Sequence, residues 1–255
     1  MTTDPVTLYC LSLLPGKDVN VGPYPWKTAI DLGSLGVPWR FKGLTIEEIR
    51  TTFEANTAVK GITVPAIQDG EKWVFDSFPL AQLLNSKYGT EERTLFPAGE
   101  EFARLFDTWA DRDLAAEVIP LLAPWLFKAQ QPASAAWLVK EKMGGDQSKM
   151  DGLVNATSDP AFIEKQAAAI RAKLITLERT LQANKDEGKG QFIAGNDHPS
   201  HADAAVWGWY GTLLAVNHMG IKLGPLTFKH ETLPLVGAWA DAVQKAAGVD
   251  LQLEQ

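Results

Sequence analysis

ITVPAIQDGEKWVFDS, residues 62–77, is the stretch of sequence that decides the fold. Its two apolar runs flank an Asp69-Gly70 pair, which is a strong signal for a tight turn between antiparallel strands. Pro65 lies in the first run, where a trans proline normally marks the edge or the end of a strand. A cis Val64-Pro65 bond would keep the proline there and turn the backbone groups of Val64 outward. The stretch therefore predicts a β-hairpin with a proline at its entry.

The hairpin leads into a predicted helix over Ser77–Tyr88. Asp76 and Ser77 close the stretch and Pro79 follows, a combination that favours a helix start. Polar groups at a helix N-terminus can hold an anion, and here they follow the outward backbone groups of Val64. The sequence thus predicts an anion-binding corner at these positions.

The residues before the hairpin predict alternating strands and helices. Val6–Leu13 and Pro38–Phe41 are typical of strands, and Trp26–Leu35 is typical of a helix. Thr45-x-x-Glu48 is a capping box, in which side chains and backbone amides bond reciprocally at a helix start. The predicted order is β-α-β-α-β-β-α.

After a charged linker predicted over 89–97, the pattern becomes helical. Apolar residues recur at helical spacing in stretches that begin at Phe102, Phe162, Val206 and Leu235. These stretches predict the core faces of a helical bundle. Between Gln130 and Pro160 the pattern loosens, which predicts an elongated connection with short helices.

Ser200-x-x-Asp203 is the strongest local signal of the second half. It is a capping box of the Asp type, and we expect both residues to stabilise a buried helix. His198 and His201 flank the cap residue Ser200 at a spacing of three, but no cysteine or carboxylate lies in register with them, so we predict no metal site.

Composition narrows the function classes. The 255 residues are 45% apolar and 22% charged, as in globular proteins, and the net charge of −7 disfavours nucleic-acid binding. No apolar run of membrane length and no signal-peptide pattern is present. The single cysteine, Cys10, cannot form an intramolecular disulfide, and we expect it to be buried and inert in a cytoplasmic protein.

The hairpin, the Asp76-Ser77 helix start and the Ser200-x-x-Asp203 box together resemble the glutathione transferases. The resemblance implies a thioredoxin-like glutathione-binding domain over 1–89 and an all-α bundle over 98–255 that contributes the pocket for a second substrate. It also implies glutathione as co-substrate, hydrophobic aromatic ligands and a homodimer.

The segment from Gly22 to Lys27 carries a narrower resemblance. A long loop that leads to Pro23-x-x-Trp26-Lys27 is similar to the fungal etherase-related class called FuA and to bacterial lignin β-etherases. In those relatives the residue before the proline is usually a serine that donates to the glutathione sulfur, and here it is Gly22. Backbone amides near Gly22, the side chain of Asn20 or Tyr24, or only weak activation of the thiol remain as alternatives.

The family's other contacts can be carried over to matching positions. The backbone of Val64, before Pro65, is expected to pair with the cysteinyl part of glutathione. Asp76 and Ser77 are expected to bind the γ-glutamyl ammonium and carboxylate, and Lys42 the glycyl carboxylate. Further candidates are Trp26 and Lys27 for glutathione and Trp109, Trp125 and Phe127 for the second-substrate pocket.

The resemblance implies a detoxifying enzyme that conjugates glutathione to aromatic or electrophilic compounds or reduces peroxides with it. The alternatives are glutathione-dependent cleavage of β-aryl ethers in lignin fragments, and a non-catalytic module that binds aromatic metabolites.

Overall fold

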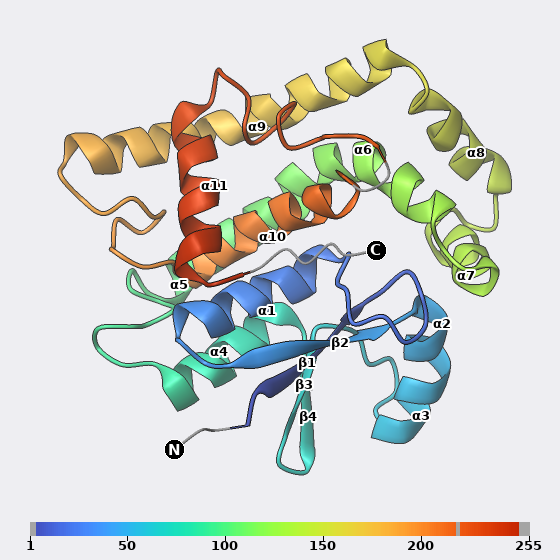
Figure 1. Ribbon diagram of the computed structural model, residues 1–255, viewed down its shortest axis with the longest axis horizontal. Helices are drawn as coiled ribbons and strands as arrows, with labels where there is room; N and C mark the ends of the chain where they lie inside the picture. The colour runs from blue at the N-terminus through green and yellow to red at the C-terminus, as the bar shows by residue number, and fades with distance from the viewer. Residues whose placement is uncertain (1–3, 218–219, 250–255) are drawn as a thin grey trace.

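The computed structural model describes residues 4–217 and 220–249. Figure 1 shows a sheet with helices in the first part of the chain and a helical bundle above it. Helix α1 (Pro23–Ser34) lies between the sheet and α10 (His201–Ala215), so it belongs to the core of both parts.

The sheet has four strands in the order β2-β1-β3-β4: β1 (Val6–Leu11), β2 (Trp39–Leu44), β3 (Ala66–Asp69) and β4 (Lys72–Phe75). β1 runs parallel to β2, and β3 runs antiparallel to both β1 and β4. The predicted hairpin is confirmed. The Val64-Pro65 bond is cis, as expected, but β3 begins after it at Ala66 and not at Ile62, because proline has no N–H for the ladder.

The first-half helices follow their local signals. α4 (Ser77–Tyr88) has the predicted bounds, whereas α1 begins one turn earlier than predicted because Pro23 occupies its first position. The Thr45 capping box opens one continuous helical stretch made of α2 (Ile46–Glu48), the π-helical η1 (Ile49–Phe53) and α3 (Glu54–Thr57).

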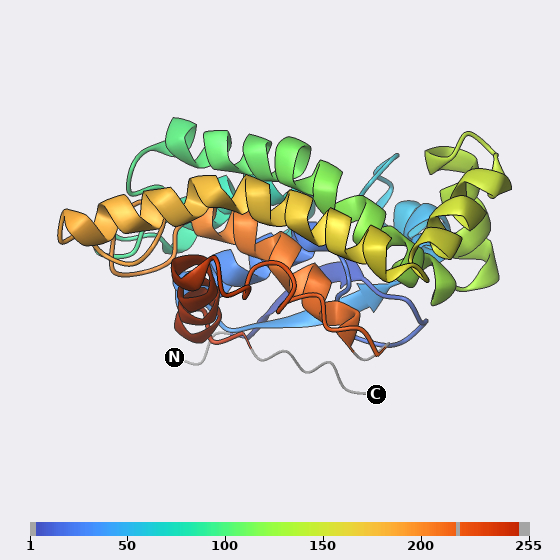
Figure 2. The same ribbon diagram turned by 90° about the horizontal axis from the view of Figure 1, so that it is seen from above.

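The remaining described residues contain helices and no strand. They form α5 (Glu100–Trp109), the π-helical η2 (Ala110–Leu114), α6 (Ala115–Lys128), α7 (Pro132–Lys142), α8 (Gln147–Ala156), α9 (Pro160–Asp186), α10 and α11 (Pro234–Ala246). Figure 2 shows α6, α9 and α10 side by side, with α7 and α8 at one end of the bundle near α2. The expected fold class, a thioredoxin-like domain followed by an all-α bundle, is confirmed.

Asp203 stabilises the buried start of α10. Its Oδ2 accepts hydrogen bonds from the Ser200 amide at 2.8 Å and the Ser200 hydroxyl at 2.7 Å. Its Oδ1 accepts from the Ile193 amide at 2.9 Å and from Trp239 Nε1 at 2.7 Å. Asp203 therefore joins three segments of the bundle, which is more than a local cap requires.

Among the described helices, none combines the length and the apolar character that crossing a membrane demands.

Candidate functional site

A cavity of about 540 Å³ lies between the sheet-bearing part and the bundle. It is lined by Leu11, Tyr24, Ile46, Ile49, Arg50, Thr63, Val64, Pro65 and Asp76 from the first part and by Asp111, Trp137, Leu138 and Lys142 from the bundle. Four of the residues expected at the site, Tyr24, Val64, Pro65 and Asp76, thus line one cavity.

The predicted anion-binding corner forms one end of this cavity. The Asp76 amide donates to the Pro65 carbonyl at 3.1 Å, which holds the start of α4 against the cis proline. Asp76 has a φ of 75°, and its Oδ1 accepts from the Ser77 amide at 2.8 Å. Within the described residues, neither the Ser77 hydroxyl nor the Phe78 amide donates a hydrogen bond. These two donors are therefore available to an anion at the helix N-terminus.

Two of the groups expected to bind the sulfur, Asn20 and the backbone of Gly22, are hydrogen-bonded to each other. The Gly22 amide donates to Asn20 Oδ1 at 3.0 Å, and Asn20 Nδ2 donates to the Gly22 carbonyl at 2.8 Å. Asn20 is buried, and neither residue lines the cavity. Pro23 and Pro25 have no amide hydrogen. Within the part of the chain that the structure describes, the amide of Tyr24 in the first turn of α1 donates no hydrogen bond.

Gly22 is not required by backbone conformation. Its φ of −97° is open to any residue. A Cβ there would lie 3.3 Å from Leu11 Cβ and 3.4 Å from Pro25 Cδ, so a serine would fit only tightly.

Tyr24 is the expected sulfur-binding side chain that faces the cavity. Its ring packs edge-on against Trp209 with centroids 6.0 Å apart, and Lys27 Nζ lies 5.1 Å from its centroid. Burial, followed by the carboxylates of Asp111, Asp107 and Asp76, raises the pKa of Tyr24 to about 12. The phenol therefore stays protonated near neutral pH and can act as a hydrogen-bond donor.

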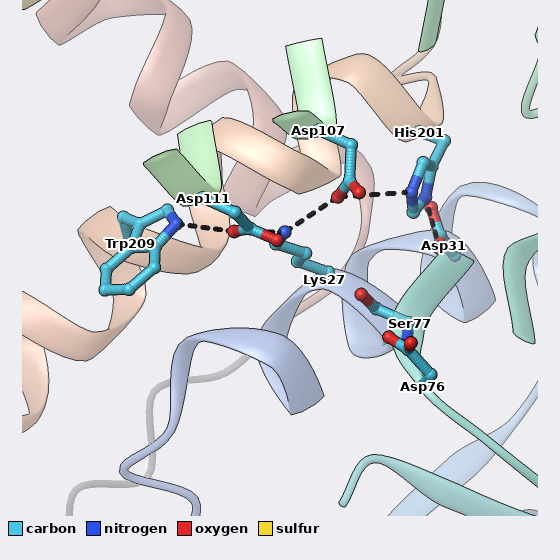
Figure 3. A network of polar contacts seen from close by, with 8 residues as sticks. All are labelled: Lys27, Asp31, Asp76, Ser77, Asp107, Asp111, His201 and Trp209. Atoms are coloured by element: carbon cyan, nitrogen blue, oxygen red, sulfur yellow. Dashed lines mark hydrogen bonds and ion pairs between the residues drawn. The ribbon is translucent and has the colours of Figure 1, made fainter. Parts of the chain in front are cut away.

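Lys27 belongs to a buried network between the two parts of the chain (Figure 3). Its Nζ lies 2.7 Å from Asp107 Oδ1 and 2.7 Å from Asp111 Oδ1, and its side chain has no exposed surface. Trp209 Nε1 donates to Asp111 Oδ1 at 3.1 Å. Burial raises the pKa of Asp111, and the Lys27 ammonium opposes that shift. Lys27 was expected among the glutathione-binding residues, and the structure instead places it behind the cavity.

The network continues to His201. Its Nδ1 lies 2.8 Å from Asp31 Oδ2, and its Nε2 lies 3.8 Å from Asp107 Oδ1. Burial raises the pKa of Asp31, and the neighbouring His201 opposes that shift. His198 contacts Asn196 and the Glu92 carbonyl, so the two histidines have separate partners. In the described ranges, no group of three or more His, Cys, Asp or Glu side chains could hold a metal ion.

Two other expected contacts lie outside the cavity. Trp26 is 3% exposed and packs edge-on against Phe41 and Trp207, with centroids 5.2 and 5.8 Å away. Lys42 is about half exposed and lies 3.5 Å from Asp18 Oδ1. The cation that lines the cavity on this side is Arg50, which sequence reasoning missed.

Arg50 is positioned by two contacts. Its Nη1 donates to the Ile62 carbonyl at 3.1 Å, and its guanidinium lies 5.3 Å from the centroid of the Trp137 ring. The residue comes from η1, and Asp111 of the same cavity comes from η2. Both π-helical segments therefore supply charged groups to the site, as such segments often do.

The three residues expected at the second-substrate pocket do not line this cavity. Trp109 packs near Phe106, and Trp125 lies under Lys128, while Phe127 is partly buried; none of the three expected residues lines the cavity. Helix α7 instead contributes Trp137, Leu138 and Lys142, which we call the α7 wall. The segment between Gln130 and Pro160 lacks a clear helical period, so only its tryptophan hinted at a role.

Cys10 lies on β1 and is fully buried. Burial raises the pKa of its thiol, and the Asp18 carboxylate adds to the effect. Such a thiol is unreactive, in agreement with the expectation from sequence.

Comparison with known proteins agrees with the fold. Residues 102–219 match the family model described as "Glutathione S-transferase, C-terminal domain". A glutathione S-transferase of Ceriporiopsis subvermispora, solved in complex with glutathione, is 19% identical with a TM-score of 0.72, and the match covers 97% of this chain and 99% of that one.

The glutathione transferase GSTFuA3 from Phanerochaete chrysosporium is 22% identical with a TM-score of 0.69, again over 97% and 99% of the two chains. A second such enzyme from that fungus, GSTFuA2, is 18% identical with a TM-score of 0.66, over 96% and 98%. The chain thus has the glutathione transferase fold seen in the fungal FuA structures, and the match to the family model lies in its helical part.

Proposed function

We propose that this protein is a glutathione transferase whose co-substrate binds in the cavity between the two parts. One observation carries the proposal: the Val64-Pro65 backbone, the Asp76-Ser77 helix start and Tyr24 meet at the same cavity. The Val64 backbone would pair with the cysteinyl part of glutathione. Asp76 would bind its γ-glutamyl ammonium, and the Ser77 hydroxyl and Phe78 amide would bind the adjacent carboxylate.

Arg50 replaces Lys42 as the proposed partner of the glycyl carboxylate. A guanidinium can bind a carboxylate through two parallel hydrogen bonds, and Arg50 lines the cavity whereas Lys42 pairs with Asp18.

Tyr24 is the proposed sulfur-binding residue. A free thiol has a pKa of about 8.5, so only a small fraction is ionised at neutral pH. The Tyr24 hydroxyl and the free Tyr24 amide at the start of α1 can both donate to the sulfur, and the helix dipole adds to their effect. The thiol then loses its proton to solvent, and the thiolate forms a bond to an electrophilic carbon. In a substitution the leaving group departs with the electron pair, and in an addition, as to an isothiocyanate, the pair moves to the neighbouring nitrogen, which takes a proton from solvent.

Conjugation to small aromatic or electrophilic compounds is the reaction proposed first. β-Aryl ether cleavage follows the same course with a phenolate as leaving group, and the likeness to the FuA fold supports it as the second candidate. A module that only binds aromatic ligands is supported by Gly22, since its position carries no hydroxyl and its amide is bonded to Asn20.

We further propose a homodimer in the cytoplasm. Leu105 of α5 is 66% exposed, and contact with a second copy would cover this apolar side chain. Sedimentation of the full chain should give the mass of a dimer, and a monomer at all concentrations would contradict this part of the proposal.

Titration calorimetry tests the proposed function directly. Glutathione should bind the full chain at one site per chain, and an isothiocyanate should then be conjugated in its presence. Release of a phenol from a β-aryl ether would select the second candidate. If glutathione binds but neither reaction occurs, the protein would be a ligand-binding module. Absence of glutathione binding would overturn the proposal.

A further inference from the structure

The contacts proposed for glutathione leave one carboxylate of the cavity without a role. Of the described residues, Asp76 and Asp111 are the acidic ones that line the cavity, and Asp76 is assigned to the γ-glutamyl ammonium. Asp111 lies on η2, and its side chain is 25% exposed. Under the proposed function, on which this inference rests, the thiol of glutathione lies at Tyr24, which lines the same cavity. Asp111 and the thiol therefore share one cavity.

The same two side chains hold Asp111 and Tyr24 close to each other. Trp209 Nε1 donates to Asp111 Oδ1 at 3.1 Å, and the Trp209 ring packs edge-on against the Tyr24 ring with centroids 6.0 Å apart. Lys27 Nζ lies 2.7 Å from Asp111 Oδ1 and 5.1 Å from the centroid of the Tyr24 ring. Figure 3 shows Asp111 between Trp209 and Lys27, which fix its orientation.

Both donors bind the same oxygen of Asp111. Within the described residues no hydrogen bond reaches its Oδ2, and this atom is not buried. Burial of the residue as a whole raises the pKa of Asp111, and the Lys27 ammonium opposes that shift. A carboxylate with a raised pKa is a better proton acceptor near neutral pH. The charged groups around it are Lys27 of α1 and Asp107 of α5, and the other charged side chains of the cavity are Arg50, Asp76 and Lys142.

The charge of the cavity favours a nearby acceptor for the thiol proton. If this proton left for solvent, the cavity would hold a thiolate close to the Asp111 carboxylate, and two like charges in one site disfavour each other. Transfer of the proton to Asp111 produces the thiolate while the total charge of the site stays the same.

We propose that Asp111 accepts the proton of the glutathione thiol and returns it to the product. The S–H bond breaks, the electron pair stays on sulfur, and the proton forms an O–H bond with Asp111 Oδ2. The thiolate then bonds to the carbon of an isothiocyanate, and an electron pair of that group moves to the neighbouring nitrogen. The Asp111 O–H gives its proton to this nitrogen, which restores the carboxylate. The proton therefore stays in the cavity and does not pass through solvent.

The number of protons released for each thiolate formed tests the proposal. Glutathione is titrated into the full chain at about pH 7, where a free thiol is almost entirely protonated. Calorimetry in two buffers with different enthalpies of ionisation counts the protons released on binding, and thiolate absorbance counts the thiolates. S-Methylglutathione, whose sulfur has no proton, gives the protons released by the rest of the molecule. After this subtraction, the natural protein should form the thiolate with almost no release of protons.

Asp111→Asn removes the acceptor and keeps the shape of the side chain. Its complex should release about one proton for each thiolate formed. Its turnover of an isothiocyanate should fall about 100-fold, as is typical when a general acid–base group is lost. Asp107→Asn is the matched control: it removes the other carboxylate that lies 2.7 Å from Lys27 Nζ, but Asp107 does not line the cavity. This variant should keep the proton release and the turnover of the natural protein.

A natural protein that releases about one proton for each thiolate would overturn the inference without any variant, since the proton then goes to solvent. So would an Asp111→Asn protein that forms the thiolate without releasing protons, because another group then accepts them. Equal losses of turnover in Asp111→Asn and Asp107→Asn would show that both act only through the contact with Lys27. Absence of glutathione binding would instead overturn the proposed function, and the inference with it, so calorimetry distinguishes the two failures.

Discussion

Replacing Tyr24 with phenylalanine removes one hydroxyl and keeps the ring that packs against Trp209. A charge-assisted hydrogen bond contributes about 1.5–3 kcal/mol, so the pKa of bound glutathione should rise by about 1–2 units. The absorbance of the glutathione thiolate as a function of pH measures this pKa. Because the pKa of Tyr24 is held at about 12, this donor does not titrate in the range where the thiol does.

Tyr88→Phe is the control for this change, since Tyr88 is exposed at the end of α4 and does not line the cavity. Glutathione bound to Tyr88→Phe should have the same thiol pKa as glutathione bound to the natural protein. An unchanged value in Tyr24→Phe as well would exclude the hydroxyl and leave the Tyr24 amide as the sulfur donor.

Ser77 allows a similar test of the anion-binding corner. Ser77→Ala should weaken glutathione binding by about 1–3 kcal/mol, because a carboxylate then loses one buried donor. Ser86→Ala on the same helix is the control: Ser86 is exposed, and its hydroxyl donates to the Leu83 carbonyl. Equal affinities of the two variants in calorimetry would remove Ser77 from the site.

Helices and strands with local signals were predictable, and those shaped by packing were not. The hairpin and the start of α4 depend on turn and cap residues that act within a few positions. The π-helical segments that bring Arg50 and Asp111 to the cavity have no comparable sequence period. The same holds for α7, whose Trp137 reaches the cavity through packing on α2. About half of the residues that line the cavity therefore could not be predicted, because they lie on elements whose positions depend on tertiary contacts.

Asp203 caps its own helix and also accepts hydrogen bonds from two other segments of the bundle. From the sequence alone, Asp203→Ala would remove one helix cap and lower the free energy of unfolding by about 0.5–2 kcal/mol. Asp203→Ala leaves several buried donors unpaired at about 1–3 kcal/mol each, so the loss should exceed about 3 kcal/mol.

Asp159→Ala removes an exposed cap that accepts the Ala161 amide, and its cost should stay within the range for a single cap. Denaturation of both variants with urea gives the comparison. Similar losses would show that Asp203 acts as a cap alone, and lost glutathione binding in folded Asp203→Ala would give this residue a different role.

The molecule as a whole is joined across its two parts by buried charges. The Pro-x-x-Trp-Lys motif suggested a ligand contact for Lys27, because sequence alone does not show which side of α1 faces the bundle. In the structure the lysine lies between Asp107 and Asp111, and α1 packs against α10. The lysine of this motif therefore contributes a buried contact between the two parts of the chain.

Lys27→Met should therefore act on stability more than on binding. It keeps the length of the side chain but leaves two carboxylates without their cation, and breaking a buried ion pair costs about 3–5 kcal/mol. Lys87→Met breaks the exposed pair with Asp69 and should cost at most about 1 kcal/mol. Tryptophan fluorescence and circular dichroism during denaturation measure both losses.

Charge compensation completes the test. Adding Asp107→Asn and Asp111→Asn to Lys27→Met removes the unpaired charges while the side-chain volumes stay close to the original. Most of the lost stability should return, because the penalty comes from uncompensated buried charge and not from missing attraction. A triple variant as unstable as Lys27→Met alone would show that the hydrogen bonds of the Lys27 ammonium, and not its charge, hold the two parts together.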